Sequence, residues 1–329
     1  MTAISPLLSI CIPTYNRSAC LRECLESLLV SARGYEDRIE IVISDNASTD
    51  DTSDVVSEFQ QRNPFIRYHR NESNVGSEPN RYIVVSLATG KYIWIFSDDD
   101  KVTEQAVAAI FKRIEAGYNL IICDFSVWSR DFSVRKMRRW LPMRRDREFS
   151  DHNALMKCFG LHIGFTSSVV IKREVFLIIP PSEYEPLMPY FPQLYSIYAG
   201  IAEDCHCAYV SDPIVCYRAD NAVSPDYYKF FIVGYLIIFE ALRSKGYTED
   251  ALRAAKRHIL KRYVINNIVL RKSQADASLK DIARILRSYY RKDWLFWTVC
   301  IPLIYVPVPT FLVRLVVKIA LAVRRVRNR

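Results

Sequence analysis

Three adjacent aspartates follow directly after the apolar run 92–96 and one serine. An apolar run of this kind is typical of a buried strand. Adjacent carboxylates at the end of such a strand repel one another unless a cation or hydrogen-bond donors compensate their charge. Hard divalent cations prefer oxygen ligands and often share them with substrate phosphates. The stretch therefore indicates either a divalent-cation site that uses Asp99 and Asp100, or a solvated loop whose last acid caps the next helix.

Strand and helix patterns alternate over the first hundred residues and must position these carboxylates. Short apolar runs predict strands, and apolar residues at helical spacing predict helices. Strands are expected at 8–12, 39–44, 66–69 and 92–96, and helices at 21–30, 55–61, 81–88 and 103–116. Alternation of this kind is typical of βαβ units, so we expect an α/β fold with a mostly parallel central sheet flanked by helices.

Three polar loops follow strands of this predicted sheet. They are 13–17 (PTYNR), 45–49 (DNAST) and 97–100 (SDDD). In open parallel sheets, ligands bind beyond the carboxyl ends of the strands. We therefore expect the three loops to converge on one binding crevice.

The patterns change further along the chain. Strands are expected at 119–127, 162–172, 207–210 and 214–217, with a constrained loop over 180–192, which holds five prolines. Helices are expected at 227–243, 249–272 and 279–292.

Charge is concentrated in two stretches of this 329-residue chain. Residues 130–147 and residues 310–329 each carry +6, whereas the whole chain carries +9. Two basic patches on a nearly neutral body suggest a local anionic partner, such as nucleic acid, anionic lipid headgroups or a pyrophosphate substrate. The stretch 130–147 is either a solvated loop or a segment that meets a lipid-linked diphosphate or the membrane surface.

The nine cysteines do not form a C-x-x-C pair, and Cys205-His206-Cys207 is too dense to supply a whole zinc site. The first residues show no signal-peptide pattern, so we expect a reducing cytoplasm.

The end of the sequence combines apolar and basic character. Residues 294–313 contain no charged side chain, which is long enough for a membrane span, but Pro302, Pro307 and Pro309 would break or kink one. A basic amphipathic helix over 310–329 with tryptophans upstream is typical of an interfacial anchor. We expect a monotopic or re-entrant attachment; a true span, a buried helix and a dimer contact are the alternatives.

Four motifs together resemble family 2 glycosyltransferases, which have a GT-A fold with a Rossmann-like sheet. They are 9-SICIPTYNR-17, 41-IVISDNASTDDT-52, 74-NVG-76 and 90-GKYIWIFSDDD-100. The resemblance is dense over 7–115, thin over 150–220 and absent after 221. The serine before the three aspartates and 217-YRADNAVS-224 resemble the abequosyltransferase-like subgroup of bacterial O-antigen synthesis.

The resemblance implies a nucleotide site and a metal site. The implied nucleotide-binding residues are Pro13, Tyr15, Arg17, Asp45, Asn74, Gly76 and Asp98. Asp45 would read the edge of the pyrimidine ring, Asp98 would approach the ribose, and Asp99 would bind a Mn²⁺ or Mg²⁺ that bridges the diphosphate. The chain departs from the common family pattern at Ser97, where an aspartate is usual.

The catalytic base is less clearly marked. Glu203-Asp204 looks like the family's acidic motif, yet Asp204 stands only nine residues before Pro213, closer than the family's spacing. That spacing places the base near Pro192-Gln193, where no acid exists. Asp204, Glu185 and Glu183 are the candidate bases.

The resemblance implies a nucleotide-sugar-binding half at 1–115, an acceptor-binding half at 116–220 and a helical C-terminal region at 221–329. The expected reaction is inverting, metal-dependent transfer of a sugar to a lipid-linked glycan, the acceptor being a polyprenyl diphosphate saccharide. We expect the protein at the cytoplasmic face of the bacterial inner membrane, held through its basic C-terminal tail, with no nucleic-acid partner.

Other functions are considered beside this one. A nucleotidyltransferase would need a glycine-rich, lysine-bearing phosphate loop and a dehydrogenase would need G-x-G-x-x-G, and the sequence has neither. The remaining alternative is a catalytically inactive, membrane-bound glycan-binding or scaffold protein that keeps the GT-A fold.

Overall fold

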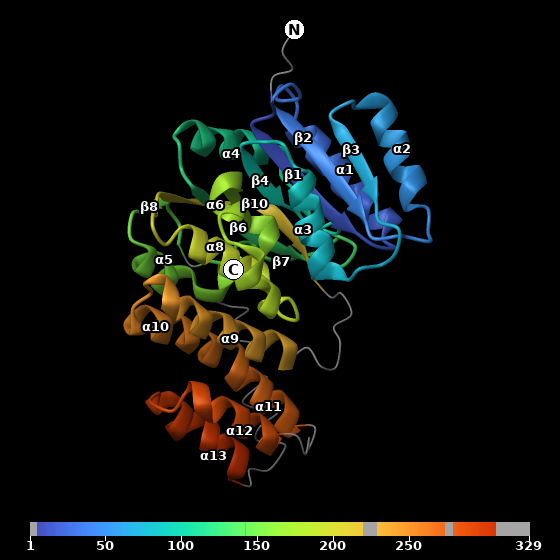
Figure 1. Ribbon diagram of the computed structural model, residues 1–329. Coiled ribbons are helices and arrows are strands. Elements are labelled where there is room, and N and C mark those ends of the chain that lie inside the picture. Colours follow the sequence, from blue (N-terminus) through green and yellow to red (C-terminus); the bar gives the residue numbers. More distant parts are fainter. Residues whose placement is uncertain (1–4, 142, 220–228, 274–278, 307–329) are drawn as a thin grey trace. The chain divides into compact units, whose positions relative to one another are not determined.

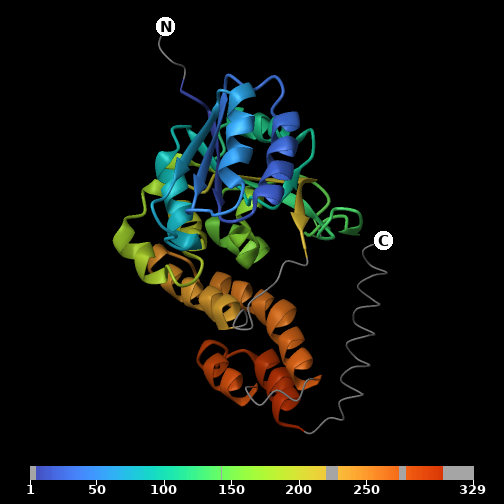
Figure 2. The ribbon, with the colours of Figure 1, turned by 90° about the vertical axis from the view of Figure 1, so that its right-hand side faces the viewer.

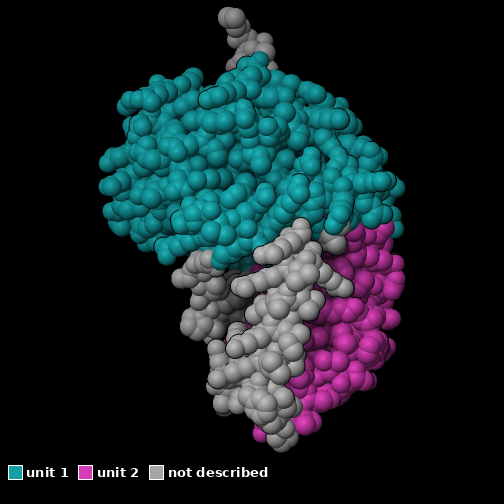
Figure 3. Space-filling model, turned by 180° about the vertical axis from the view of Figure 1, so that it is seen from behind, with its two compact units in different colours: residues 1–152, 162–222 teal, residues 153–161, 223–329 magenta. Residues whose placement is uncertain are grey.

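The computed structural model describes residues 5–141, 143–219, 229–273 and 279–306. The chain divides into two compact units (Figure 3). The first contains residues 1–152 and 162–222, and the second contains residues 153–161 and 223–329.

The first unit is built on one sheet of ten strands among the described residues (Figure 1). The strands are β1 (Leu8–Thr14), β2 (Ile39–Asp45), β3 (Ile66–Arg70), β4 (Tyr92–Ile95), β5 (Lys101–Val102), β6 (Leu120–Trp128), β7 (Arg135–Met137), β8 (Arg147–Phe149), β9 (Val169–Lys172) and β10 (Cys207–Arg218). Their order is β3-β2-β1-β4-β9-β6-β10-β5, with β7 beside β6 and β8 beside β10. The strands from 116–220 therefore extend the sheet begun by 1–115 and do not form a separate domain.

Strand direction fixes where the loops lie. β1 to β4 pair in parallel, and so do β6 and β10. β9 is antiparallel to both β4 and β6, so β4 and β6 point the same way. The carboxyl ends of β1, β2, β4, β6 and β10 therefore share one edge of the sheet, which confirms the predicted mostly parallel architecture.

Helices cover both faces of this sheet. Figures 1 and 2 show α1 (Ser18–Ser31), α2 (Thr52–Arg62) and α4 (Ala106–Glu115) on one face and α3 (Ser77–Leu87) on the other. The shorter elements on the side of α3 are α6 (Arg173–Leu177), α7 (Pro181–Tyr184), η3 (Glu185–Leu187) and α8 (Pro192–Gly200). The core between α1 and the sheet contains Leu21, Leu25 and Leu28, whose spacing places them on one face of the helix.

Three predicted elements differ from the structure. The strand expected at 162–172 is limited to β9, because η1 (Gly160–Gly164) and η2 (Thr166–Ser168) are tight 3₁₀ turns. The loop expected at 180–192 contains the short helices α7 and η3. The strands expected at 207–210 and 214–217 are one strand, β10, whose register shifts around Pro213 because proline has no N–H for the ladder.

A buried acid joins the amino ends of the first strands. Glu40 accepts hydrogen bonds from Ser9 Oγ at 2.6 Å, from the backbone and hydroxyl of Thr89 at 2.6 and 2.9 Å, and from Arg67 at 2.7 Å. Burial alone raises the pKa of Glu40, but these donors outweigh it and hold the pKa below its ordinary value of 4.5.

The second unit is helical. Its elements are α5 (His152–Phe159), η4 (Lys229–Val233), α9 (Gly234–Ala241), η5 (Leu242–Lys245), α10 (Glu249–Ile259), η6 (Leu260–Val264), α11 (Ile265–Ser273), α12 (Leu279–Tyr289), η7 (Phe296–Cys300) and α13 (Ile301–Tyr305). The predicted helices at 227–243, 249–272 and 279–292 overlap these elements. None of the described helices has both the length and the apolar character that a membrane crossing requires. The predicted anchor covers residues 294–329. Its part from residue 307 onward lies outside the described residues.

Candidate active site

A cleft of about 480 Å³ opens at the carboxyl edge of the parallel strands. Its walls come from the loop after β1, from the end of β2, from the start of α3, from the end of β4 and from η2. The lining residues are Pro13, Thr14, Tyr15, Arg17, Asn46, Asn74, Gly76, Ser77, Asn80, Arg81, Ile95, Phe96, Ser97, Asp98 and Thr166. The structure thus brings together six of the seven residues predicted to hold a nucleotide.

Asp98 and Asp99 share one cation, the guanidinium of Arg17. Arg17 Nη1 lies 3.0 Å from Asp98 Oδ1 and 3.1 Å from Asp99 Oδ2. The second oxygen of Asp98 accepts from Thr14 at 2.7 Å, and that of Asp99 accepts from Ser97 Oγ at 2.5 Å. Burial raises the pKa of Asp98 to about 6 in spite of the charge of Arg17. A second cation beside these carboxylates would stabilise their charged forms.

The residues present fit a divalent cation. Arg17 Nη1 marks a point from which one positive charge reaches both carboxylates, and the Arg17 side chain is 47% exposed, so it can move away. Carboxylate oxygens are suitable ligands for Mg²⁺ and Mn²⁺. No group of three His, Cys, Asp or Glu residues that could hold a metal occurs within the described part of the chain. A cation here would therefore need further oxygen ligands from a diphosphate or from water.

Asp100, the second predicted metal ligand, has a different environment from Asp99. Its side chain is buried, Oδ2 accepts from Ser167 Oγ at 2.7 Å, and Oδ1 accepts from the backbone N–H of Arg218 at 3.0 Å. Burial and the nearby charge of Asp99 raise its pKa well above the ordinary value. Both oxygens are thus engaged in holding the loop between β4 and β5.

Arg218, the last residue of β10, fastens this loop from the other side. Its buried guanidinium donates from Nε to the carbonyl oxygen of Asp99 at 2.7 Å. It also donates to Glu23 Oε2 at 2.8 Å and to the Arg130 carbonyl at 2.6 Å. No sequence motif identified Arg218 in this role, because it lies more than a hundred positions from the aspartates and only the sheet places it beside them.

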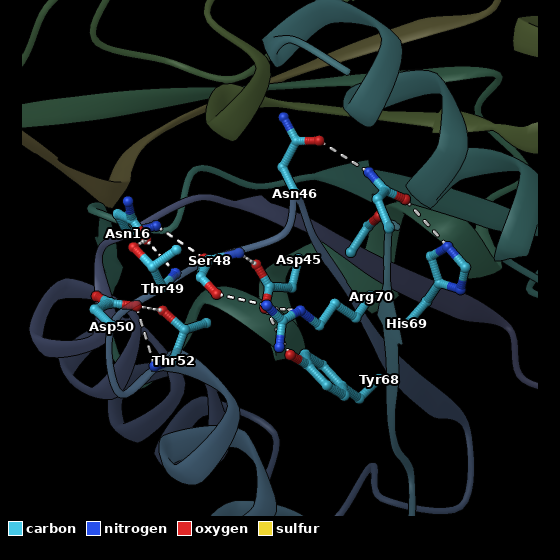
Figure 4. Close-up of polar contacts among 12 residues, drawn as sticks. Asn16, Asp45, Asn46, Ser48, Thr49, Asp50, Thr52, Tyr68, His69 and Arg70 are labelled. Carbon is cyan, nitrogen blue, oxygen red and sulfur yellow. Dashed lines mark hydrogen bonds and ion pairs between the residues drawn. The ribbon is translucent and has the colours of Figure 1, made fainter. Parts of the chain in front are cut away.

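Asp45, predicted to contact a pyrimidine ring, is not among the residues that line the cleft. Figure 4 shows its carboxylate among Ser48, Tyr68 and Arg70. Oδ1 accepts from Ser48 N at 2.8 Å, Oδ2 accepts from Tyr68 Oη at 2.6 Å, and Arg70 Nε lies 4.0 Å away. Because the side chain is completely buried and already bonded, it holds the loop after β2 in shape.

Asn46, the next residue, lines the cleft instead. Its Nδ2 donates to Asn74 Oδ1 at 2.7 Å and to the carbonyl of Gly76 at 3.2 Å. Its Oδ1 accepts from the backbone N–H of Val75 at 3.0 Å. These bonds attach the loop before α3 to the end of β2, and they bring the predicted residues Asn74 and Gly76 into the wall.

The first two loops are also tied to each other (Figure 4). The backbone N–H of Asn16 donates to Ser48 Oγ at 2.9 Å, and Asn16 Oδ1 accepts from the backbone N–H of Thr49 at 2.7 Å. Asn16 has φ of 51°, in the left-handed region that asparagine tolerates better than most residues. The loops after β1 and β2, which were expected to meet at one crevice, are therefore hydrogen-bonded to each other.

The structure separates Asp204 from the cleft. Asp204 Oδ2 accepts from Asn119 Nδ2 at 2.7 Å, and Asn119 directly precedes the first residue of β6. The amino end of β6 lies at the sheet edge opposite to the three aspartates, since β4 and β6 are parallel. Asp204 is therefore badly placed to act as the base.

The other two candidate bases lie in the segment that packs on α3. Glu183 accepts from Tyr195 Oη at 2.6 Å, and the neighbouring Tyr184 stacks on Tyr82 of α3 with ring centroids 4.3 Å apart. Glu185 is exposed, and no residue in the described ranges forms a hydrogen bond or ion pair with its carboxylate. Gln193, near the slot where the family has its acid, is buried with Oε1 lacking a partner among the described residues.

Several residues at the cleft were not named individually from the sequence. They are Thr14, Asn46, Asn80, Arg81 and Ser97, together with Ser167 behind the cleft. Arg81 adds a second cation to the wall and pairs with Glu78 in the first turn of α3. Thr14, Asn46 and Ser97 lie inside the three polar loops that were expected to form the crevice.

Comparisons with known proteins identify the family of the chain. The model of glycosyl transferase family 2 matches residues 9–177. The abequosyltransferase RfbV of Salmonella typhimurium is 33% identical over 227 residues, which cover 65% of this chain and 67% of that protein. A GalNAc(5)-diNAcBac-PP-undecaprenol β-1,3-glucosyltransferase of Campylobacter jejuni is 28% identical over 161 residues, which cover 47% of this chain and 49% of that enzyme.

Solved structures share the fold. Residues 1–349 of TarS from Staphylococcus aureus, in complex with UDP-GlcNAc, superpose with a TM-score of 0.61 at 14% identity, covering 86% of this chain and 81% of that one. The mannosyltransferase PcManGT of Pyrobaculum calidifontis, in complex with GDP-Man and Mn²⁺, superposes with a TM-score of 0.55 at 14% identity, covering 91% of this chain and 85% of that one.

Proposed function

The chain belongs to glycosyl transferase family 2 and is a glycosyltransferase, and we propose that it transfers a sugar from a nucleoside diphosphate sugar to a hydroxyl of a lipid-linked glycan. The proposed reaction depends on Mn²⁺ or Mg²⁺ and inverts the anomeric configuration. The observation that carries the proposal is the cleft itself, where loops after β1, β2 and β4 meet around Asp98 and two arginines, one of which also contacts Asp99.

The donor nucleotide is proposed to lie along the cleft wall. Pro13 and Tyr15 provide the apolar part of the wall, and Arg17 and Arg81 provide positive charge for the diphosphate. Asp98 accepts from a ribose hydroxyl. Asn46 lies in the wall where the base would bind, and its bonds to Asn74, Val75 and Gly76 keep the loop before α3 in place there.

Asp99, with Asp98 beside it, would hold the divalent cation at the point that Arg17 now reaches. Bound there, the cation would stabilise the negative charge that develops on the leaving nucleoside diphosphate. Arg17, half exposed, would turn from the carboxylates to the diphosphate. Asp100 and Arg218 would keep the backbone of Asp99 fixed during turnover.

A general base must remove the proton of the acceptor hydroxyl as that hydroxyl attacks the anomeric carbon. We assign this role to Glu185, whose exposed carboxylate has no competing hydrogen bond in the described structure. Glu183 is the second candidate, although Tyr195 already donates to it. The expected result for Glu185→Gln is loss of transfer with donor binding kept; a Glu185→Gln variant with normal turnover would exclude the assignment.

The acceptor is proposed to be a polyprenyl diphosphate saccharide in the synthesis of an O-antigen-like bacterial polysaccharide. The name of the Campylobacter jejuni relative places its own acceptor on undecaprenol diphosphate, and the Salmonella typhimurium relative is named an abequosyltransferase. The corresponding location is the cytoplasmic face of the inner membrane, with peripheral or monotopic attachment that involves the basic tail. No nucleic-acid partner is proposed.

The first test is binding of UDP, CDP, GDP and dTDP, each with and without Mn²⁺, measured as a shift in melting temperature. A ligand that binds only the folded state raises its stability by mass action. We expect a Mn²⁺-dependent shift with one of the four nucleotides, and its absence in Asp99→Asn. If none of them shifts the protein, the cleft does not bind a nucleotide and the proposal fails.

A further inference from the structure

The segment from Trp294 to Tyr305 in the second unit turns aromatic side chains outward. Trp294, Trp297 and Tyr305 are 63%, 42% and 44% exposed. They lie at spacings of three and eight residues, which place them on one face of a helical segment. The opposite face, with Phe296, Cys300 and Ile304, is buried in the unit. We call the three exposed rings the aromatic face.

Cationic side chains surround the aromatic face. Arg287 lies 6.0 Å from the ring centroid of Trp297 and 5.7 Å from that of Tyr305, and Arg257 lies 5.7 Å from that of Trp294. The only acid between residues 284 and 306 is Asp293, which is buried and paired with Arg257. The face therefore combines apolar rings with positive charge.

A cationic cleft of about 790 Å³ lies next to it within the same unit. Arg253, Arg291 and Lys292 line this cleft and form no ion pair among the described residues. Arg291 also connects the two features, because its carbonyl accepts from Trp297 Nε1 at 2.9 Å. Glu240, Glu249 and Asp293 also line the cleft, but they pair with Arg243, Lys256 and Arg257. The lining therefore keeps a net positive charge, which is suited to phosphate groups.

We propose that the aromatic face and this cationic cleft form a docking surface for an anionic lipid bilayer. Tryptophan and tyrosine rings are enriched at the level of lipid headgroups, and arginine and lysine are attracted to anionic lipids. The chain continues from this surface into residues 307–329, which add six Arg or Lys and no acid. A second copy of the chain fits less well, because a symmetric contact would bring the same positive charges together.

The inference deepens the proposed function, since it states where the enzyme meets the membrane that would carry its acceptor. It also narrows the anchor that the sequence predicts over 294–329. Here the contact is made by folded helices before residue 307, with rings held in place by Arg287 and Arg257.

The test uses the full chain and sedimentation with vesicles of phosphatidylcholine, with and without phosphatidylglycerol. We expect binding to the anionic vesicles that weakens with salt. Trp294→Ala combined with Trp297→Ala should weaken this binding about tenfold or more, because two rings no longer leave water. The matched control is Ile178→Ala, which removes a 67% exposed apolar side chain from the first unit and should leave vesicle binding unchanged.

A second measurement locates the rings directly. Brominated lipids should quench part of the tryptophan fluorescence of the wild type, and the double variant should lose this quenchable part. Arg291→Gln combined with Lys292→Gln should reduce binding to anionic vesicles. In the fraction of this variant that still binds, brominated lipids should quench tryptophan fluorescence as they do in the wild type. These variants address the charge and the rings separately, so a folding defect in one of them does not decide the result.

Two outcomes would overturn the proposal. One is equal vesicle binding by the double tryptophan variant and the wild type, which would assign the attachment to residues outside this surface. The other is a wild-type dimer that the double variant converts to a monomer. Nucleotide binding measured without vesicles separates this inference from the proposed function. The double variant should bind the nucleotide as the wild type does. If the proposed function is wrong, the wild type itself should not bind a nucleotide.

Discussion

Replacing Asp99 and Asp100 one at a time separates a ligand of the cation from a support of the loop. Asp100 uses one oxygen to accept from Ser167 and the other to accept from Arg218 N. An asparagine can reproduce this pattern, because its oxygen can accept from Arg218 and its amide can donate to the serine hydroxyl. Asp100→Asn should therefore change the free energy of unfolding by no more than about 1 kcal/mol.

Asp100→Ala should be different. It leaves the hydroxyl of Ser167 and the N–H of Arg218 without their acceptor in a buried place. An unsatisfied buried polar group costs about 1–3 kcal/mol, so we expect the alanine variant to lose about 2–4 kcal/mol of unfolding free energy. Urea unfolding with a common m-value measures the difference between the two variants.

Asp99→Asn should affect the Mn²⁺ response and leave the stability nearly unchanged. Its carboxylate lies against the half-exposed Arg17 and the hydroxyl of Ser97, so stability should change by no more than about 1 kcal/mol. The Mn²⁺-dependent part of nucleotide binding should disappear, because an amide is a much weaker ligand for a hard cation than a carboxylate. Equal loss of the Mn²⁺ response in Asp100→Asn and Asp99→Asn would refute the assignment of separate roles.

Three further predictions concern the parts that support the site. Glu40→Gln should lower the unfolding free energy by about 1–3 kcal/mol at neutral pH, measured by urea titration. Because the folded pKa of Glu40 is below 4.5, the difference from wild type should persist above that pH and shrink as the pH falls through the folded pKa; a difference that grows in acid would contradict this. Gly200→Ala should cost at least about 1–3 kcal/mol, because its added Cβ would lie 2.2 Å from the carbonyl oxygen of Val175; an unchanged melting temperature would count against this packing. Arg218→Lys should weaken Mn²⁺-dependent nucleotide binding even where the variant stays folded at the assay temperature, because a single ammonium nitrogen cannot reach all three acceptors that bond to three different guanidinium nitrogens; nucleotide titration of the folded variant decides this.

The sequence determined the layers and the edge of the sheet at which the site would form. Apolar runs of strand length separated by helical patterns specify βαβ units, and the direction of parallel strands brings their following loops to one edge. The polar residues after 8–12, 39–44 and 92–96 could therefore be assigned to one crevice before any contact was known. The family resemblance rested on the same local motifs, and the comparisons confirm the family.

Only the tertiary structure decided which of two neighbouring residues faces the cleft. Asn46 lines it and Asp45 is buried, because Tyr68 of the adjacent strand supplies a donor to the aspartate. Asp98 lines it and Asp100, two residues further on, does not, because η2 and the end of β10 supply Ser167 and Arg218 as partners of Asp100. Successive side chains near a strand end point in different directions, and partners distant in sequence determine which direction is stabilised.

The direction of strands also decided the position of Asp204. Its sequence resembles an acidic motif, yet it lies at the amino end of β6 because β9 runs antiparallel between β4 and β6. The number of residues between two motifs does not indicate at which edge of the sheet a loop will lie when one strand of the sheet is antiparallel to the others. That information resides in hydrogen bonds between strands far apart in sequence, and these form only when the whole sheet is assembled.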